Sequence, residues 1–202
     1  MCKTRASVLK LNNLVLQSLV DHNVTASTVS IFPDTITNMR VLERDGPLHV
    51  CNTLIPLGIF PVFHGDAVFD SAHRCTIFSG DKIMIWLAEN LENRPKLAVF
   101  LTDVRGVLDR PPTVDDAELV EEIVVKSDGS IRFPETTTAS HDVTGGIRGK
   151  IECAVEIAKL GVPVVIVQIG TDHALKALSG EIPFGNCTLI RLEEEKRNVI
   201  TD

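Results

Sequence analysis

The chain has 202 residues, of which 44% are hydrophobic and 23% are charged, and its formal net charge is −7. This composition is typical of a globular protein, and an acidic balance without a basic run argues against nucleic acid as a partner. No apolar stretch is long enough to span a bilayer, and the five cysteines are scattered singly, so we expect neither a membrane helix nor a zinc site or disulfide framework.

The first 20 residues contain basic side chains but no acidic one: Lys3, Arg5 and Lys10. Such a composition occurs in mitochondrial presequences. The same stretch has apolar residues at helical spacing: Val8, Leu11, Val15 and Leu19. That periodicity favours an amphipathic helix over a presequence, and the family resemblance described below strengthens this preference.

Four short apolar runs rich in Val, Ile and Phe are candidate buried strands: residues 28–32, 59–63, 97–101 and 164–169. Three segments between or after these runs carry helix patterns: residues 82–91, a shorter acid-rich stretch at 115–123, and 151–160. Alternating strands and helices predict one α/β domain over residues 1–202, with a mainly parallel central sheet and helices on both faces.

The segment after residue 123 has a different pattern. Residues 124–126 and 130–133 flank Asp128-Gly129, which is a strong hairpin signal. Residues 134–140, rich in threonine, have the composition of a mobile loop.

Two short glycine loops lie where ligands meet an α/β sheet, at the carboxyl ends of strands. One is His64-Gly65-Asp66, after the second strand candidate, and the other is Ser79-Gly80-Asp81, before the helix pattern at 82–91. Glycine lets a ligand approach the backbone, and a helix start offers unpaired N–H groups, so both loops suit a phosphate group. The alternative is ordinary turn chemistry with Asp81 as a helix N-cap.

Two further segments suit a nucleotide. Thr102-Asp103-Val104-Arg105-Gly106-Val107 follows the third strand candidate and presents a carboxylate to a sugar or base. Gly145 and Gly146 precede a helix, and Lys150 lies one turn inside it, an arrangement that can hold a transferring phosphoryl group. The alternative is a glycine turn with Lys150 as a solvated charge. The Walker pattern is absent from the sequence, and the four loops together favour a nucleotide-dependent phosphotransferase.

Five motifs in order resemble isopentenyl phosphate kinases, a branch of the amino acid kinase superfamily. They are H-G-D-A-V-F-D (64–70), C-T-I-F-S-G-D (75–81), F-L-T-D-V-R-G-V-L-D-R-P-P (100–112), D-V-T-G-G-I-R-G-K (142–150) and A-K-L-G-V-P-V (158–164). The resemblance runs from about Thr4 to Leu192, nearly the whole chain.

The resemblance implies an α/β/α sandwich that transfers the γ-phosphoryl group of Mg-ATP to isopentenyl phosphate, giving isopentenyl diphosphate for isoprenoid synthesis. It also implies a homodimer with ATP and Mg²⁺ as cofactors. The singly scattered cysteines indicate reduced thiols and a cytoplasmic protein, and we expect no dedicated metal-ligand set. The implied ATP site comprises Asp103, Arg105, Gly106, Val107, Gly145, Gly146 and Lys150. The implied acceptor site contains Gly80, and the loops themselves add Gly65, Asp66 and Asp81 with less support.

The sequence departs from the family pattern in two places. The ATP loop reads T-D-V-R-G where archaeal members commonly have T-D-V-D-G, so Arg105 replaces a carboxylate. The family's initial K-x-G-G loop and its A-G-S-F-G-H segment, which carries the catalytic histidine, have no counterpart, and none of the six histidines can be carried over. Lys150 is then the one candidate for stabilising the transferred phosphate.

A chain without those family segments is expected to be poorly soluble or oligomeric, and slow or inactive as a kinase. Two other hypotheses stay open. In the first, the chain phosphorylates another acceptor used in the superfamily, namely aspartate, glutamate, carbamate or a nucleoside monophosphate. In the second, it is a fragment that binds a nucleotide without catalysis.

Overall fold

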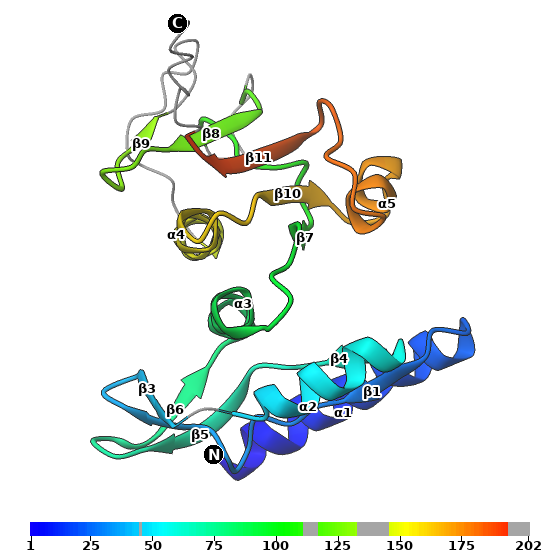
Figure 1. The fold of residues 1–202 in the computed structure, drawn as a ribbon, viewed down its shortest axis with the longest axis vertical. Helices are drawn as coiled ribbons and strands as arrows, with labels where there is room; N and C mark the ends of the chain where they lie inside the picture. Colours follow the sequence, from blue (N-terminus) through cyan, green and yellow to red (C-terminus); the bar gives the residue numbers. More distant parts are fainter. Residues whose placement is uncertain (45, 111–116, 133–145, 194–202) are drawn as a thin grey trace, which may run out of the picture. The chain divides into compact units, whose positions relative to one another are not determined.

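The computed structural model describes residues 1–44, 46–110, 117–132 and 146–193. These residues form two compact units, an N-terminal unit (Met1–Arg94) and a C-terminal unit (Pro95–Asp202), each of which combines helices and strands (Figure 1). The predicted α/β class is confirmed. The prediction of a single domain over residues 1–202 stays a prediction, and each unit is described by itself.

The N-terminal unit, apart from residue 45, forms two small sheets and three α-helices. Its elements are α1 (Cys2–Asp21), β1 (Ala26–Thr28), β2 (Ile36–Asn38), β3 (Val41–Arg44), α2 (Leu48–Leu54), the 3₁₀ helix η1 (Ile55–Leu57), β4 (Phe60–Val62), β5 (Asp66–Asp70), β6 (Arg74–Phe78) and α3 (Gly80–Asn90). Strands β1 and β4 form a parallel pair, and the other four lie in the order β3-β2-β5-β6. In that sheet only β2 and β5 run parallel.

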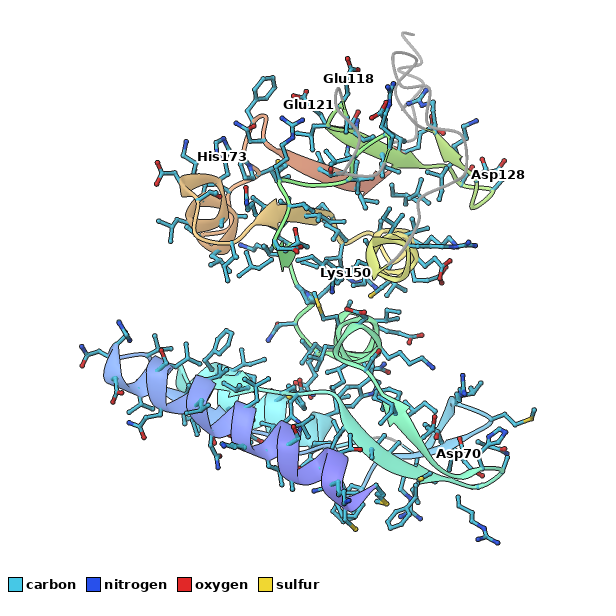
Figure 2. All side chains as sticks on the ribbon, turned by 180° about the vertical axis from the view of Figure 1, so that it is seen from behind. Asp70, Glu118, Glu121, Asp128, Lys150 and His173 are labelled. Atoms are coloured by element: carbon cyan, nitrogen blue, oxygen red, sulfur yellow. The ribbon has the colours of Figure 1, made fainter. Side chains whose placement is uncertain are left out.

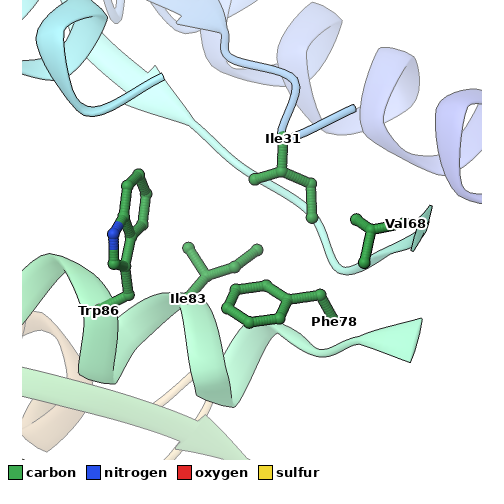
Figure 3. Packing of buried hydrophobic residues seen from close by; sticks show 5 residues of the cluster. All are labelled: Ile31, Val68, Phe78, Ile83 and Trp86. Atoms are coloured by element: carbon green, nitrogen blue, oxygen red, sulfur yellow. The ribbon is translucent and has the colours of Figure 1, made fainter. Parts of the chain in front are cut away.

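Buried apolar side chains from several segments hold the N-terminal unit together. Ile31, Val68, Phe78, Ile83 and Trp86 pack into one cluster, with α3 supplying the last two (Figure 3). Each of these side chains is at most 5% exposed. Because Phe78 ends β6 and Ile83 lies in the first turns of α3, this core fixes the start of α3 relative to the sheet.

The described residues of the C-terminal unit form one sheet and two helices. Its elements are β7 (Ala98–Thr102), β8 (Glu122–Val125), β9 (Ile131–Arg132), α4 (Gly146–Lys159), β10 (Val164–Gln168), α5 (Asp172–Leu178) and β11 (Cys187–Leu192). The strand order is β7-β10-β11-β8-β9. The β7–β10 and β11–β8 pairs are parallel and the β10–β11 and β8–β9 pairs antiparallel, so the sheet is mixed.

Helices cover the strands at the centre of this sheet. Helix α4 packs on β8, β10 and β11, and α5 packs on β7 and β10 (Figure 1). Residues Val164, Val165, Ile166 and Val167 of β10 are all fully buried. This is the continuous apolar run typical of a strand covered on both faces, and it explains why the sequence signal for β10 was strong.

Three of the four strand candidates lie within a residue of an observed strand: 59–63 matches β4, 97–101 matches β7 and 164–169 matches β10. The candidate at 28–32 is displaced, because β1 ends at Thr28. The Ser30 hydroxyl donates to the Phe32 carbonyl and accepts from the Phe32 amide, so the chain turns there instead of continuing the strand. Ile31 is nevertheless 1% exposed and belongs to the core.

The helix patterns at 82–91 and 151–160 are confirmed as α3 and α4, which begin two and five residues earlier than predicted. The acid-rich helix at 115–123 is wrong in its described part. Leu119 bridges Leu108, and β8 begins at Glu122 and pairs with β11. Ile123, Val124 and Val125 are buried there, and strand pairing of these β-branched residues overrides the short helical pattern.

Residues 2–21 form helix α1, so the helix interpretation of the N-terminal stretch is confirmed. The inward face differs from the predicted one, because Leu11 is 63% and Val15 44% exposed. Asn12 is the buried residue, and its amide donates to the Thr28 hydroxyl over 2.8 Å. Among the described residues, no helix is both long and apolar enough to cross a bilayer.

The predicted hairpin is present as the antiparallel pair β8–β9. Gly129 has φ of +81°, and the Asp128 carboxylate accepts a hydrogen bond from the Ser130 amide. Hydrogen bonds from Ser130 hold the pKa of Asp128 below its usual value. The predicted loop at 134–140 lies outside the described residues.

Candidate active site

The two glycine loops of the N-terminal unit lie side by side. The first, residues 64–66, joins β4 to β5, and the second, residues 79–81, joins β6 to α3. The β5–β6 register pairs Asp66 with Phe78, which brings the loops together. A Cβ atom on Gly65 would lie only 3.0 Å from the Gly80 nitrogen, so glycine is needed for this close approach. The structure thus gathers Gly65, Asp66, Gly80 and Asp81 in one place.

The start of α3 leaves room for a ligand. Ser79, not Asp81, is the N-cap, and its hydroxyl accepts from the Lys82 amide over 3.3 Å. Asp81 lies in the first turn, where a negative charge is favourable. A Cβ atom on Gly80 would meet nothing within 4 Å. The backbone at Gly80 is therefore open at a helix start, the position at which proteins commonly bind phosphate groups.

Asp66 is bound within the protein. Its side chain is fully buried, and Oδ2 accepts from an Arg5 guanidinium nitrogen over 2.5 Å. Oδ1 accepts from the Ala67 amide over 2.7 Å. Arg5 also stacks on Phe32, with its guanidinium carbon 3.7 Å from the ring centroid. Asp66 therefore anchors the loop, and Arg5 is a residue that the sequence analysis noted only as part of a basic helix.

His64 is a second residue to which the sequence analysis gave no role. Its Nδ1 lies 3.1 Å from the Gly65 carbonyl oxygen, and because that oxygen can only accept, Nδ1 carries a proton. Its Nε2 is buried and has no hydrogen-bond partner among the residues that the structure describes. Buried nitrogen atoms without a hydrogen-bond partner are uncommon in proteins, so the His64 ring is an exceptional feature of the 64–66 loop.

Asp70, the last residue of the H-G-D-A-V-F-D motif, joins two turns (Figure 2). Its fully buried carboxylate accepts from the Thr37 hydroxyl and from the backbone amides of Arg40, Ala72 and His73, at 2.7–3.0 Å. Burial alone would raise the pKa of Asp70, but these hydrogen bonds outweigh it and hold the pKa well below its usual value. The carboxylate thus ties the β2–β3 turn to the β5–β6 turn.

In the C-terminal unit, the loop after β7 is fixed at both of its first residues. The Thr102 hydroxyl donates to the Val104 carbonyl over 2.7 Å, and the Gln168 amide donates to the Asp103 carbonyl over 3.1 Å. The Asp103 side chain is exposed. The backbone of Asp103 is therefore held between β7 and β10 while its carboxylate faces solvent.

Gly106 and Val107 form the buried part of the same loop. A Cβ atom on Gly106 would lie 2.6 Å from the Thr188 hydroxyl and 2.8 Å from a Leu119 methyl carbon. The Val107 amide donates to the Thr188 hydroxyl, which donates in turn to the Val120 carbonyl. Thr188, which the sequence analysis missed, therefore fixes this end of the loop from β11.

Arg105, the residue before this buried pair, is exposed. Its guanidinium donates to the Ala117 carbonyl over 3.1 Å. It lines an open depression of about 510 Å³, whose other lining residues are Ala117, Glu118, Leu119, Glu121 and Asn186. The two glutamates are labelled in Figure 2.

Lys150 lies one turn inside α4, which begins at Gly146. Its ammonium nitrogen is 5.7 Å from the ring centroid of Phe100, a buried residue of β7 (Figure 2). Because Phe100 is three residues before Asp103, Lys150 lies along the strand that leads into the Asp103 loop. Gly145 is outside the described residues.

The described residues contain no group of three or more His, Cys, Asp or Glu side chains that could hold a metal ion. Magnesium in phosphoryl-transfer sites is held mostly by substrate phosphates and water, with one or two carboxylates. The exposed Asp103 carboxylate fits that limited requirement. A resident all-protein magnesium site is not needed.

Both units therefore have glycine loops at the ends of strands. These features define an α/β protein of the class that binds its ligands at the carboxyl ends of strands. The amino acid kinase family model matches residues 2–168. The chain belongs to the amino acid kinase family.

Among known relatives, the isopentenyl phosphate kinase of Arabidopsis thaliana is 39% identical over 192 residues, which cover 89% of this chain and 57% of that protein. The isopentenyl phosphate kinase of Thermoplasma acidophilum is 40% identical over 104 residues, 51% of this chain and 39% of that protein. The chain thus spans little more than half the length of the first of these relatives.

Solved structures support the fold. The crystal structure of the T. acidophilum isopentenyl phosphate kinase product complex matches with a TM-score of 0.66 at 24% identity. The match covers 90% of this chain and 66% of that one. At this identity the likeness shows that the fold is shared.

Proposed function

We propose that this chain takes part in the ATP-dependent phosphorylation of isopentenyl phosphate, giving isopentenyl diphosphate. The observation that carries the proposal is the packing of the 64–66 loop on the start of α3, which leaves Gly80 open at a helix N-terminus. Open backbone at a helix N-terminus is a common binding site for the phosphate group that such an acceptor carries. The names of the relatives that match over most of the chain support the same acceptor.

In the acceptor half of this proposal, Gly80 contacts the phosphate of isopentenyl phosphate. Gly65 permits the close approach of the two loops, and Asp66 anchors the first loop through Arg5. Asp81 lies beside Gly80 in the first turn of α3. In this proposal Gly80 contacts the ligand, whereas Gly65 and Asp66 position the loop.

In the nucleotide half, Asp103 contacts ATP from the end of β7, and Lys150 stabilises the transferred phosphoryl group. Gly145 and Gly146, the glycines of the sequence motif before Lys150, bind the phosphates of ATP in this proposal. Gly106 and Val107 are buried, so they position the loop that binds the nucleotide. Arg105 is exposed and can contact the solvent-facing side of the nucleotide. Catalysis of this kind depends on positioning and on charge at the phosphoryl group.

ATP and Mg²⁺ are the cofactors of the proposed reaction, and Mg²⁺ supplies charge neutralisation on the phosphates. We further propose a homodimer located in the cytoplasm. Two alternatives must be distinguished from this proposal by experiment. One is phosphorylation of a different acceptor of the family, and the other is nucleotide binding without phosphoryl transfer.

Replacing Lys150 tests the nucleotide half. Lys150→Met should lower the rate of phosphoryl transfer by about a hundredfold or more, because the cation near the transferred group is lost. Lys159→Met is the matched control, since Lys159 lies in the last turn of the same helix and pairs with Glu156. Equal rates for the two variants, measured by phosphorus NMR with Mg-ATP and isopentenyl phosphate, would contradict the role of Lys150.

Gly80→Ala tests the acceptor half. The added methyl group has room in the protein, so the thermal midpoint should stay close to that of the wild type. The methyl group would occupy the space offered to the phosphate, so the Kd for isopentenyl phosphate should rise about tenfold or more while the Kd for ATP stays unchanged. Unchanged acceptor binding in calorimetry would place the phosphate elsewhere.

A further inference from the structure

Arg5 makes two contacts that together bridge three segments of the N-terminal unit. Its guanidinium pairs with Asp66 at the start of β5 and stacks on Phe32, which follows β1. The Arg5 side chain is 18% exposed and that of Asp66 is fully buried. A planar guanidinium can satisfy a carboxylate and lie on an aromatic ring at once, which a lysine cannot do equally well.

The ion pair lies next to the loops of the acceptor site. Asp66 immediately follows Gly65, and Gly65 is packed against the Gly80 nitrogen, the Ser79 Cα and the Phe78 carbonyl. A buried carboxylate that loses its cation must either find another partner or draw the loop toward water. Movement of Asp66 would therefore move Gly65 off the start of α3.

We propose that Arg5 is a positioning residue of the acceptor site, which holds the 64–66 loop against Gly80 through its ion pair with Asp66. This inference rests on the proposed function for its effect on isopentenyl phosphate, whereas the effect on the loops is independent of the ligand. Arg5 does not touch the acceptor, and its effect passes through Asp66 and Gly65.

Four variants of the full chain test the proposal. Arg5→Met removes the cation and leaves the buried carboxylate unpaired. Arg5→Met combined with Asp66→Asn removes both charges. Arg5→Lys keeps the charge but loses the planar contact with Phe32. Lys3→Met is the control, because Lys3 is an exposed cation on the same helix.

The first readout is amide hydrogen exchange. Arg5→Met should speed exchange at residues 64–67 and 79–82 by about tenfold or more, while α2 and the C-terminal unit stay unchanged. The double variant should exchange more slowly at both loops than Arg5→Met, because it buries no unpaired charge. Uniform acceleration over the whole N-terminal unit, or none at the two loops, would overturn the proposal.

The second readout is calorimetric binding of isopentenyl phosphate and, separately, of Mg-ATP. Arg5→Met should raise the Kd for isopentenyl phosphate about tenfold and change the Kd for Mg-ATP less than about twofold, Arg5→Lys should lie between, and Lys3→Met should change neither. Equal weakening of both ligands would overturn the positioning role. Failure of the wild-type chain to bind isopentenyl phosphate would contradict the proposed function itself, and the exchange data would still decide whether Arg5 holds the loops.

Discussion

At the residue scale, single side chains fix turns and loops of the backbone in both units. Asp70 holds two turns through one buried carboxylate, and Thr188 holds the nucleotide loop through one hydroxyl. The sequence analysis included Asp70 only within a motif and missed Thr188. Neither role could be predicted, because Asp70 joins His73, three residues away, to Arg40, 30 residues away, and the partners of Thr188 lie 81 and 68 residues away.

The ionised carboxylate of Asp70 should stabilise the native state above about pH 4 and lose that effect as the pH falls below this value. The pKa of Asp70 is lower in the folded chain than the value near 3.9 expected when unfolded, so protonation favours unfolding. Asp70→Asn should therefore lower the urea midpoint at pH 7, with a smaller loss near pH 3. Asp34→Asn, at an exposed position, is the control. A loss for Asp70→Asn that is equal at both pH values would contradict this account.

Gly106→Ala should destabilise the chain by about 1–3 kcal/mol, since the added methyl group overlaps Thr188 and Leu119. Gly149→Ala, in a helix with open space around the new methyl group, should have no such cost and can stabilise by about 0.4–1 kcal/mol. Urea unfolding of the two variants measures the difference. Equal midpoints would show that the Gly106 loop adjusts freely.

At the element scale, the helix start at Ser79 links fold and site. Ser79→Ala should lower the free energy of unfolding by about 0.5–2 kcal/mol through loss of the N-cap, and Ser79→Asp should restore most of it. Ser18→Ala, at an exposed position within α1, is the control and should not destabilise. Destabilisation by Ser79→Asp as large as by Ser79→Ala would contradict the capping role.

The elements predicted from sequence were those with long or strongly apolar patterns. Helices α3 and α4 and strand β10 have such patterns, and α4 and β10 differ from the prediction mainly at their ends. Strands β5 and β6 were noted only as parts of two motifs and were not predicted as strands, and the seven-residue helices α2 and α5 carry too few turns for a clear period. The predicted helix at 115–123 failed because pairing with β11, which is distant in sequence, decides the structure of β8.

At the scale of the whole molecule, the order of the motifs along the chain was more informative about family membership than any single loop. Gly65 and Gly80, predicted from separate motifs, are packed together, and Lys150 lies along the strand that leads to Asp103. The family membership is confirmed by the match over residues 2–168. The described residues proposed for the acceptor belong to the N-terminal unit and those proposed for the nucleotide belong to the C-terminal unit, so each set can be tested with its own ligand.

Phosphorus NMR of the purified chain with Mg-ATP and isopentenyl phosphate tests the central claim most directly. The account predicts that the doublets of a diphosphate grow slowly at the expense of isopentenyl phosphate and that ADP forms in equal amount, the low rate following from the lack of a counterpart to the family's catalytic histidine. Aspartate, glutamate, carbamate and UMP, offered in parallel, should not be phosphorylated. Transfer to one of these acceptors, or binding of ATP with no transfer to isopentenyl phosphate, would contradict the account.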